Sequence, residues 1–163
     1  MNNDYESVIL GYGEISIGTT PIGMTRENGQ FTVQRTYHQI KRNGAKGIDK
    51  GSMILDEERA KLKFSFLELS KENLVKVFPG LVDESGKVSP TFEIKDTDYQ
   101  DITWTGKTKK GDAIKIELKN AFNQSNIDWA LIEKDEIKQE VEFEATYDGT
   151  TKPYSITYGT IGG

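Results

Sequence analysis

The chain has 163 residues, about the length of one domain, and we expect residues 1–163 to form a single domain. It contains no cysteine, which excludes disulfide bonds and thiolate metal sites. Its net charge of −5 argues against binding to a phosphate backbone, which relies on clustered lysine and arginine. The polar, acidic N-terminus lacks the features of a signal peptide, and no apolar run approaches the roughly 18 residues that span a membrane. We therefore expect a protein that folds in a cytoplasm and does not insert into membranes.

The first third of the chain predicts strands. Val8–Leu10 and Glu14–Gly18 are short β-leaning runs separated by glycine, which indicates strands joined by a turn or bulge. Asn28-Gly29 predicts a hairpin turn, because both central positions of a type I′ turn need positive φ. The following residues, from Phe31 to Tyr37, alternate between apolar and polar and predict a half-buried strand.

Residues 41–52 are rich in glycine and basic side chains and contain too few apolar residues to bury themselves. We expect an exposed loop or an extended hairpin tip. Loops of this length inside a compact domain are often functional.

One short helix is predicted in the middle of the chain. The segment Lys61–Phe66 alternates cleanly and predicts a strand that precedes it. Ser70 suits the N-cap of a helix over Lys71–Phe78, and Pro79-Gly80 ends it.

The second half predicts further strands after a polar loop that contains Gly86 and Pro90. The strand-like segments are Thr91–Ile94, Ile102–Trp104, Ala113–Leu118, Val141–Ala145 and Tyr154–Tyr158. Ile127–Ile132 fits a strand or a helix equally well. Together the elements predict a mostly β fold, a β-sandwich or partly closed barrel with one short flanking α-helix and a long extended loop.

No group of residues predicts catalysis. His38 is the only histidine, and no sequence motif supplies it with catalytic or metal-binding partners. Asp96, Asp98 and Asp101 match a calcium-binding loop only in part, so a solvated acidic loop is the better interpretation. We expect no enzyme, no catalytic residue, no metal and no cofactor.

The charge layout is more informative. Residues 35–50 hold five basic side chains and one acidic, whereas residues 133–148 hold seven acidic and two basic. Opposite patches on one small protein favour head-to-tail association, which closes into rings or continues as filaments. An ordinary mixed-charge surface is the alternative that charge alone leaves open.

The order of elements resembles the major tail, or tail tube, proteins of bacteriophages, including the tube proteins of phage-derived particles. The resemblance covers most of the chain, from the opening LGYGEISIGTTPIGMTRENGQFTV through the loop KRNGAKGIDKGS, the strand AKLKFSFLEL and the helix end VKVFPGL. The turn at Leu118-Lys119-Asn120-Ala121 and the stretch KDEIKQEVEFEATYD are its most suggestive pieces.

The resemblance implies a structural protein that assembles into stacked, commonly hexameric rings around a hollow tube. Residues 41–52 match the family's long loop that reaches a neighbouring subunit, with contact residues Lys41, Arg42, Lys46, Ile48 and Lys50. The lumen of such tubes is usually negative so that DNA slides through without specific binding, and Glu140, Glu142 and Glu144 form the candidate acidic lumen or interface face. Tape-measure, tail-terminator and baseplate proteins are the implied partners. The expected location is the virion tail, after assembly in the bacterial host cytoplasm.

Two other interpretations stay open. One is the inner tube of a genome-free contractile particle of the tailocin type, which the sequence does not separate from a phage tail. The other is a monomeric β-barrel that binds a ligand or carbohydrate in a pocket lined by Trp104, Trp129 and Tyr154. A hydrolase is the least supported class, because a paired nucleophile and base are missing.

Overall fold

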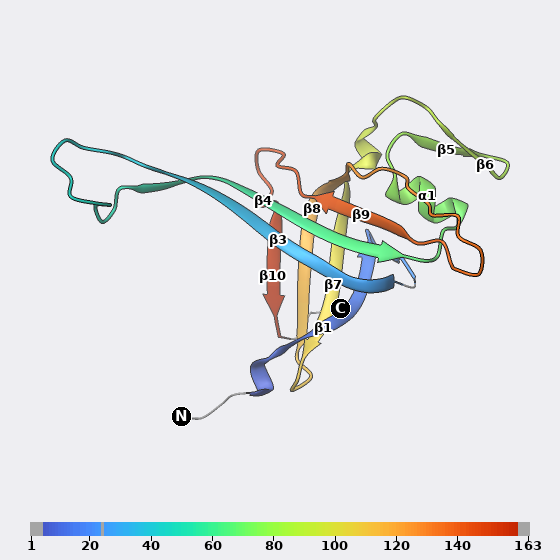
Figure 1. The fold of residues 1–163 in the computed structure, drawn as a ribbon, viewed down its shortest axis with the longest axis horizontal. Coiled ribbons are helices and arrows are strands. Elements are labelled where there is room, and N and C mark those ends of the chain that lie inside the picture. The colour runs from blue at the N-terminus through green and yellow to red at the C-terminus, as the bar shows by residue number, and fades with distance from the viewer. Residues whose placement is uncertain (1–4, 24, 160–163) are drawn as a thin grey trace.

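The computed structural model describes residues 5–23 and 25–159, and it shows a mostly β protein with one α-helix (Figure 1). The strands are β1 (Ile9–Ile17), β2 (Thr20–Pro21), β3 (Thr25–Gln39), β4 (Met53–Phe66), β5 (Leu81–Glu84), β6 (Lys87–Pro90), β7 (Gln100–Thr108), β8 (Ala113–Asn123), β9 (Gln139–Glu144) and β10 (Tyr154–Tyr158). The helix α1 spans Lys71–Val77, and two single 3₁₀ turns span Tyr5–Ser7 and Asp96–Asp98.

Eight strands form one sheet that bends into two layers. The order is β2-β1-β7-β8-β9-β4-β3, with β10 added on β8. The hairpin of β3 and β4 crosses over β1, β7, β8 and β10, so that the two layers face each other (Figure 1). The sheet does not close into a barrel, and the expected mostly β, sandwich-like fold is confirmed.

A bulge allows β8 to change layers. Its first part, Ile114–Leu118, pairs with β7 and β10, whereas Phe122 and Asn123 pair with β9. Between these parts the register shifts, and Asn120 takes a φ of 50°. The Asp101 carboxylate accepts a hydrogen bond from the Asn120 backbone N–H at 3.1 Å. Strands that switch between packed sheets commonly do so through such bulges. The turn expected at residues 118–121 is therefore wrong, because these residues continue the strand.

The core lies between the layers. It is built from alternate residues of β1, β4, β7, β8 and β9, as the burial pattern of β9 illustrates. Phe64 stacks on Phe143 with ring centroids 6.0 Å apart. The alternation expected at Lys61–Phe66 and at Val141–Ala145 is confirmed, since Leu62, Phe64 and Phe66 are buried.

The helix covers one end of this core. The Ser70 hydroxyl accepts a hydrogen bond from Asn73 N, as expected of an N-cap, and Val77 is the buried residue of α1. The predicted helix is confirmed to within one residue at its C-terminus.

Four local predictions are wrong. At Asn28-Gly29 the chain does not turn: Arg26 pairs with Ser65 and Gln30 with Lys63, so the intervening residues form a bulge within β3. The loop around Gly86 is a hairpin of β5 and β6, and residues 91–94 contain no strand, because Phe92 takes a φ of 60°. Residues 127–132 are neither strand nor helix. Of the turn or bulge expected between the two opening runs, the bulge is confirmed, because the runs form one strand, β1, with a register shift between Ile9 and Gly13.

The β3–β4 hairpin extends far beyond the two layers (Figure 1). Its strands have 15 and 14 residues, about 48 Å of extended chain, whereas strands in globular proteins mostly have about 5–6 residues. From Gln34 to Arg59, a stretch that the structure describes throughout, Ser52 is the only buried residue. We call residues 34–59 the arm, and the loop 40–52 its tip.

Candidate assembly surfaces

The tip holds all five residues predicted to contact a neighbouring subunit. Ile48 is 70% exposed, and Lys41, Lys46 and Lys50 are exposed around it. Arg42 differs from the lysines because it donates two hydrogen bonds to Asp49, of 2.6 and 3.1 Å. Within the part of the chain that the structure describes, no carboxylate forms an ion pair with Lys41, Lys46 or Lys50. The tip thus presents exposed Ile48, with exposed Ile40 at its base, among uncompensated positive charges.

Hydrogen bonds give the tip a defined shape. Ser52 closes the loop: its hydroxyl donates to Asp49 O at 2.7 Å, and its carbonyl accepts from Ile40 N at 2.8 Å. The Arg42–Asp49 pair ties the two sides together. A pre-shaped loop loses less conformational entropy when it binds than a disordered one.

The arm behind the tip exposes apolar side chains on both of its faces. Tyr37 pairs with Leu55 across the hairpin and His38 with Ile54, and Met53 lies next to the tip. Each of these three aliphatic side chains, and Tyr37, is at least 40% exposed. An isolated two-stranded hairpin is marginally stable in water, so contact with another molecule would stabilise this one.

His38 has a local role on the arm. Its Nδ1 lies 2.6 Å from Asp56 Oδ1, and both side chains are solvent-exposed. Asp56 is the extra residue of a bulge, since Thr36 pairs with Glu57 and Tyr37 with Leu55. The pair therefore bridges an irregularity in the hairpin and is not part of a buried catalytic arrangement.

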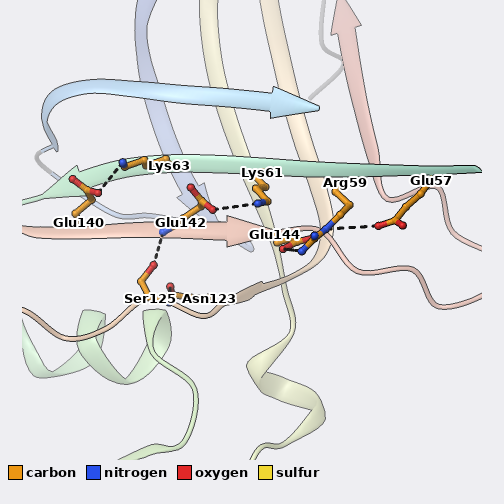
Figure 2. Close-up of polar contacts among 9 residues, drawn as sticks. All are labelled: Glu57, Arg59, Lys61, Lys63, Asn123, Ser125, Glu140, Glu142 and Glu144. Atoms are coloured by element: carbon orange, nitrogen blue, oxygen red, sulfur yellow. Dashed lines mark hydrogen bonds and ion pairs between the residues drawn. The ribbon is translucent and has the colours of Figure 1, made fainter. Parts of the chain in front are cut away.

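The three glutamates of the candidate acidic face lie in a row of ion pairs (Figure 2). Glu140 is 2.9 Å from Lys63, Glu142 is 3.8 Å from Lys61, and Glu144 is 2.6 Å from Arg59. β9 runs antiparallel to β4, with Glu144 opposite Lys61, Glu142 opposite Lys63 and Glu140 opposite Ser65. Each ion pair is therefore diagonal and joins a glutamate to the basic residue two positions before its directly opposite neighbour on β4. We call these six residues the ladder.

The ladder changes the electrostatics of this face. Hydrogen bonding to Glu144 raises the pKa of Arg59, and hydrogen bonding to Glu140 raises the pKa of Lys63. Glu57 adds a second carboxylate 3.8 Å from Arg59. The face therefore has four carboxylates against three cations, and it is much less negative than the sequence of β9 alone suggests.

A cleft of about 530 Å³ opens between β1 and β3. Its lining includes Tyr12, Phe31, Phe64 and Trp104. Of the three aromatics expected in the pocket of a ligand-binding barrel, Trp104 lines the cleft, whereas Tyr154 donates a hydrogen bond to Glu58 and Trp129 donates one to Gln139. The three named aromatics therefore do not line one pocket together, although the cleft has an aromatic lining of its own.

The structure gives the acidic loop at residues 96–101 a structural use. Asp98 accepts a hydrogen bond from Lys95 N at 2.8 Å, and Asp101 accepts one at the bulge in β8. Among residues 5–23 and 25–159, no group of three or more acidic or histidine side chains is placed to hold a metal ion. In the same ranges no helix is long and apolar enough to cross a membrane.

Comparison with known proteins identifies the fold. No family model matches the sequence, and no curated protein matches it in sequence. Among solved structures, a chain of the PVC sheath-tube complex of an extracellular contractile injection system, in the extended state, aligns with a TM-score of 0.52 and 15% identity, over 93% of this chain and 91% of that chain. A chain of the anti-feeding prophage cap, a tube-terminating cap, aligns with a TM-score of 0.56 and 9% identity, over 98% of this chain and 95% of that one. At these identities the similarity shows a shared fold, and the fold agrees with the tail-tube resemblance of the sequence.

Proposed function

We propose that this protein is a structural subunit that assembles with copies of itself into stacked rings, forming the hollow tube of a phage tail or phage-like particle. The observation that carries the proposal is the fold: nearly the whole chain aligns with chains from a sheath-tube complex and from a tube cap. A ring of six copies, with tape-measure, tail-terminator and baseplate proteins as further partners, is part of the proposal. No residue is assigned a chemical step.

The arm supports self-assembly. It is far longer than its contacts with the body require, and its apolar side chains are exposed. Binding of these side chains to another subunit would remove apolar surface from water and stabilise the hairpin. The positive tip would align the incoming subunit, because complementary charge fixes register more than it adds affinity.

Unpaired strand edges support a ring. Within the described residues, β3 pairs only with β4 and β10 only with β8, so each has one edge without a strand partner. Free edges are templates for pairing with another chain. Pairing at these edges would join the sheets of adjacent subunits around the ring.

The ladder supports a role as the lumen surface. A tube that conducts cargo needs a wall with few exposed apolar or strongly attractive groups. On the ladder face each basic side chain is paired with a carboxylate, so a passing polyanion such as DNA meets few uncompensated cations. We assign this face of β4 and β9 to the lumen.

The second candidate is the inner tube of a contractile particle without a genome. It is favoured because the two assemblies that contain similar chains are an extracellular contractile injection system and an anti-feeding prophage. The near-balanced ladder also suits cargo other than DNA. Nuclease-protected DNA in particles purified from the natural source would assign the tube to a phage tail, and its absence would assign it to a genome-free particle.

Shortening the arm tests the proposal. Deletion of residues 45–50 removes the exposed part of the tip and leaves the core, which lies in the two layers, intact. We expect a folded monomer that no longer forms rings or tubes, as measured by sedimentation velocity and circular dichroism. A control is Lys87→Ala, at an exposed position of the β5–β6 hairpin, which should assemble normally. Normal tubes from the arm deletion would exclude a role for the tip.

A further inference from the structure

The segment between β8 and β9 (residues 124–138) carries apolar side chains that no strand or helix of the described chain covers. Leu131 is 80% exposed, Ile132 60% and Ile127 51%, and Trp129 is also exposed. The sequence of this segment fits a strand or a helix, but the structure forms neither. Exposed apolar groups of this size, rimmed by polar residues, mark protein interaction sites.

A buried glutamine gives the segment a defined shape. Gln139 is 1% exposed, and its side-chain oxygen accepts hydrogen bonds from Asp128 N at 3.2 Å and Trp129 Nε1 at 3.0 Å. Its side-chain nitrogen donates to Asn126 O at 3.0 Å and to Glu140 O at 2.7 Å. The loop is therefore held open in one conformation, as a pre-organised binding surface requires.

Residues of this loop line an open hollow of about 700 Å³. Ala130 and Ile132 supply apolar lining. Four carboxylates and one lysine also line the hollow, and one of the carboxylates, Glu140, is already paired with Lys63 of the ladder, so the other three carboxylates against one lysine make the hollow acidic. These charged lining residues are Asp128, Asp135, Glu136, Lys138 and Glu140.

The hollow and the arm tip lie at opposite ends of the molecule. In Figure 1 the tip is at the far left of the longest axis, and the orange loop that leads into β9 is at the right. A subunit cannot place its own tip in its own hollow. The tip has the complementary chemistry: exposed Ile48 lies between Lys46 and Lys50.

We propose that the arm tip of one copy docks into the β8–β9 loop of another copy. Ile48 would contact Ala130 and Ile132, and Lys46 and Lys50 would face the carboxylates of the hollow. The contact joins two different surfaces, so it propagates from subunit to subunit and suits a ring or a stack of rings. The inference rests on the proposed self-assembly and names the surface that receives the arm.

Cysteine cross-linking tests this contact directly, because the chain contains no cysteine. Ile48→Cys and Ile132→Cys are both exposed substitutions that leave the core unchanged. Mixed and assembled under mild oxidation, the two variants should give a cross-linked dimer, because a disulfide forms only when the two Cα atoms are within about 7 Å. The double variant should give a series of covalent oligomers. The control pair is Ile48→Cys with Phe92→Cys, at an exposed position outside the loop, and it should give no dimer.

Charge reversal provides a second readout. Two double variants reverse the charge on one side of the contact each: Lys46→Glu with Lys50→Glu in the tip, and Asp128→Lys with Asp135→Lys in the hollow. Each variant alone should fail to assemble. A mixture of the two should assemble, because the negative tip of the first variant then faces the positive hollow of the second. Tubes that form without cross-linking, and without loss of assembly on charge reversal, would overturn the docking site and leave the proposed function standing. Failure of the unmodified protein to assemble would overturn both.

Discussion

A side chain larger than that of glycine does not fit at position 106, because Trp104 occupies the space that a β-carbon would need. A β-carbon built on Gly106 would lie 2.2 Å from Trp104 Cη2, and one on Gly13 would lie 2.6 Å from Trp104 Cε2. The indole therefore packs on the backbone of β1 and β7 at the rim of the cleft.

Gly106→Ala should lower the free energy of unfolding by about 1–3 kcal/mol, because the added methyl group overpacks the Trp104 ring. Gly11→Ala is the matched control, since nothing lies within 4 Å of the position that its β-carbon would take. Chemical denaturation of both variants measures the difference. Equal stability of the two variants would show that Trp104 moves freely away from Gly106.

Asp148 gives the residue-scale prediction for pH. Backbone N–H groups of Thr151 and Thr150 donate to its carboxylate at 2.7 and 2.9 Å and lower its pKa to about 2. A depressed carboxylate pKa contributes stability that is present above the ordinary value of about 4 and is lost as pH falls toward 2. An NMR titration should give an Asp148 midpoint near 2, and Asp148→Asn should remove this contribution. A midpoint near 4 would mean that the turn at 148–151 is not held by these hydrogen bonds.

At the scale of elements, the bulge in β8 decides how the two layers are joined. Asn120 takes the left-handed conformation, in which β-branched residues are strained and glycine is not. The sequence shows an asparagine, a residue that tolerates this conformation, but it does not show that the strand continues on both sides. Residues 118–121 alone favour a turn, but pairing of β8 with β7, β9 and β10 keeps them in the strand.

Asn120→Val should destabilise the protein by about 1–2 kcal/mol, because valine is strained at positive φ. Asn120→Gly should be close to neutral, which separates backbone strain from loss of the side chain. Thermal and denaturant unfolding measure both. Equal effects of valine and glycine would contradict the strain argument.

Sequence periodicity predicts the elements that bury one face. The strands around Phe64, Ile116 and Phe143, and the helix capped by Ser70, follow from alternation or helical spacing against the core. The predictions fail where local signals compete with pairing. Asn28-Gly29 favours a turn, but β3 pairs with β4 on both sides of these residues, so they form a bulge within β3.

The candidate site is visible in the sequence only in part. Glycine and lysine enrichment marks the tip, yet the length of the arm depends on pairing between residues far apart in sequence. The glutamates of β9 appear as an acidic run, but the cations that face them lie on β4, about 80 residues earlier, and only register brings them together. The β8–β9 loop has no distinct sequence pattern, because its apolar residues fit a buried element as well as an interface.

At the scale of the whole molecule, the two ends differ in charge and shape. The arm and the β8–β9 loop lie at opposite ends of the molecule (Figure 1). The arm ends in a positive tip, and the β8–β9 loop lines an acidic hollow. A two-fold dimer uses the same patch on both subunits, whereas this arrangement joins unlike patches. We therefore expect assemblies that close as rings and stack, and no discrete two-fold dimers.

Negative-stain electron microscopy of the purified protein, over a series of concentrations, tests directly whether the chain assembles into rings and tubes. We expect hollow rings at moderate concentration and tubes of constant diameter at high concentration. A uniformly monomeric or two-fold dimeric protein at every concentration would contradict this expectation.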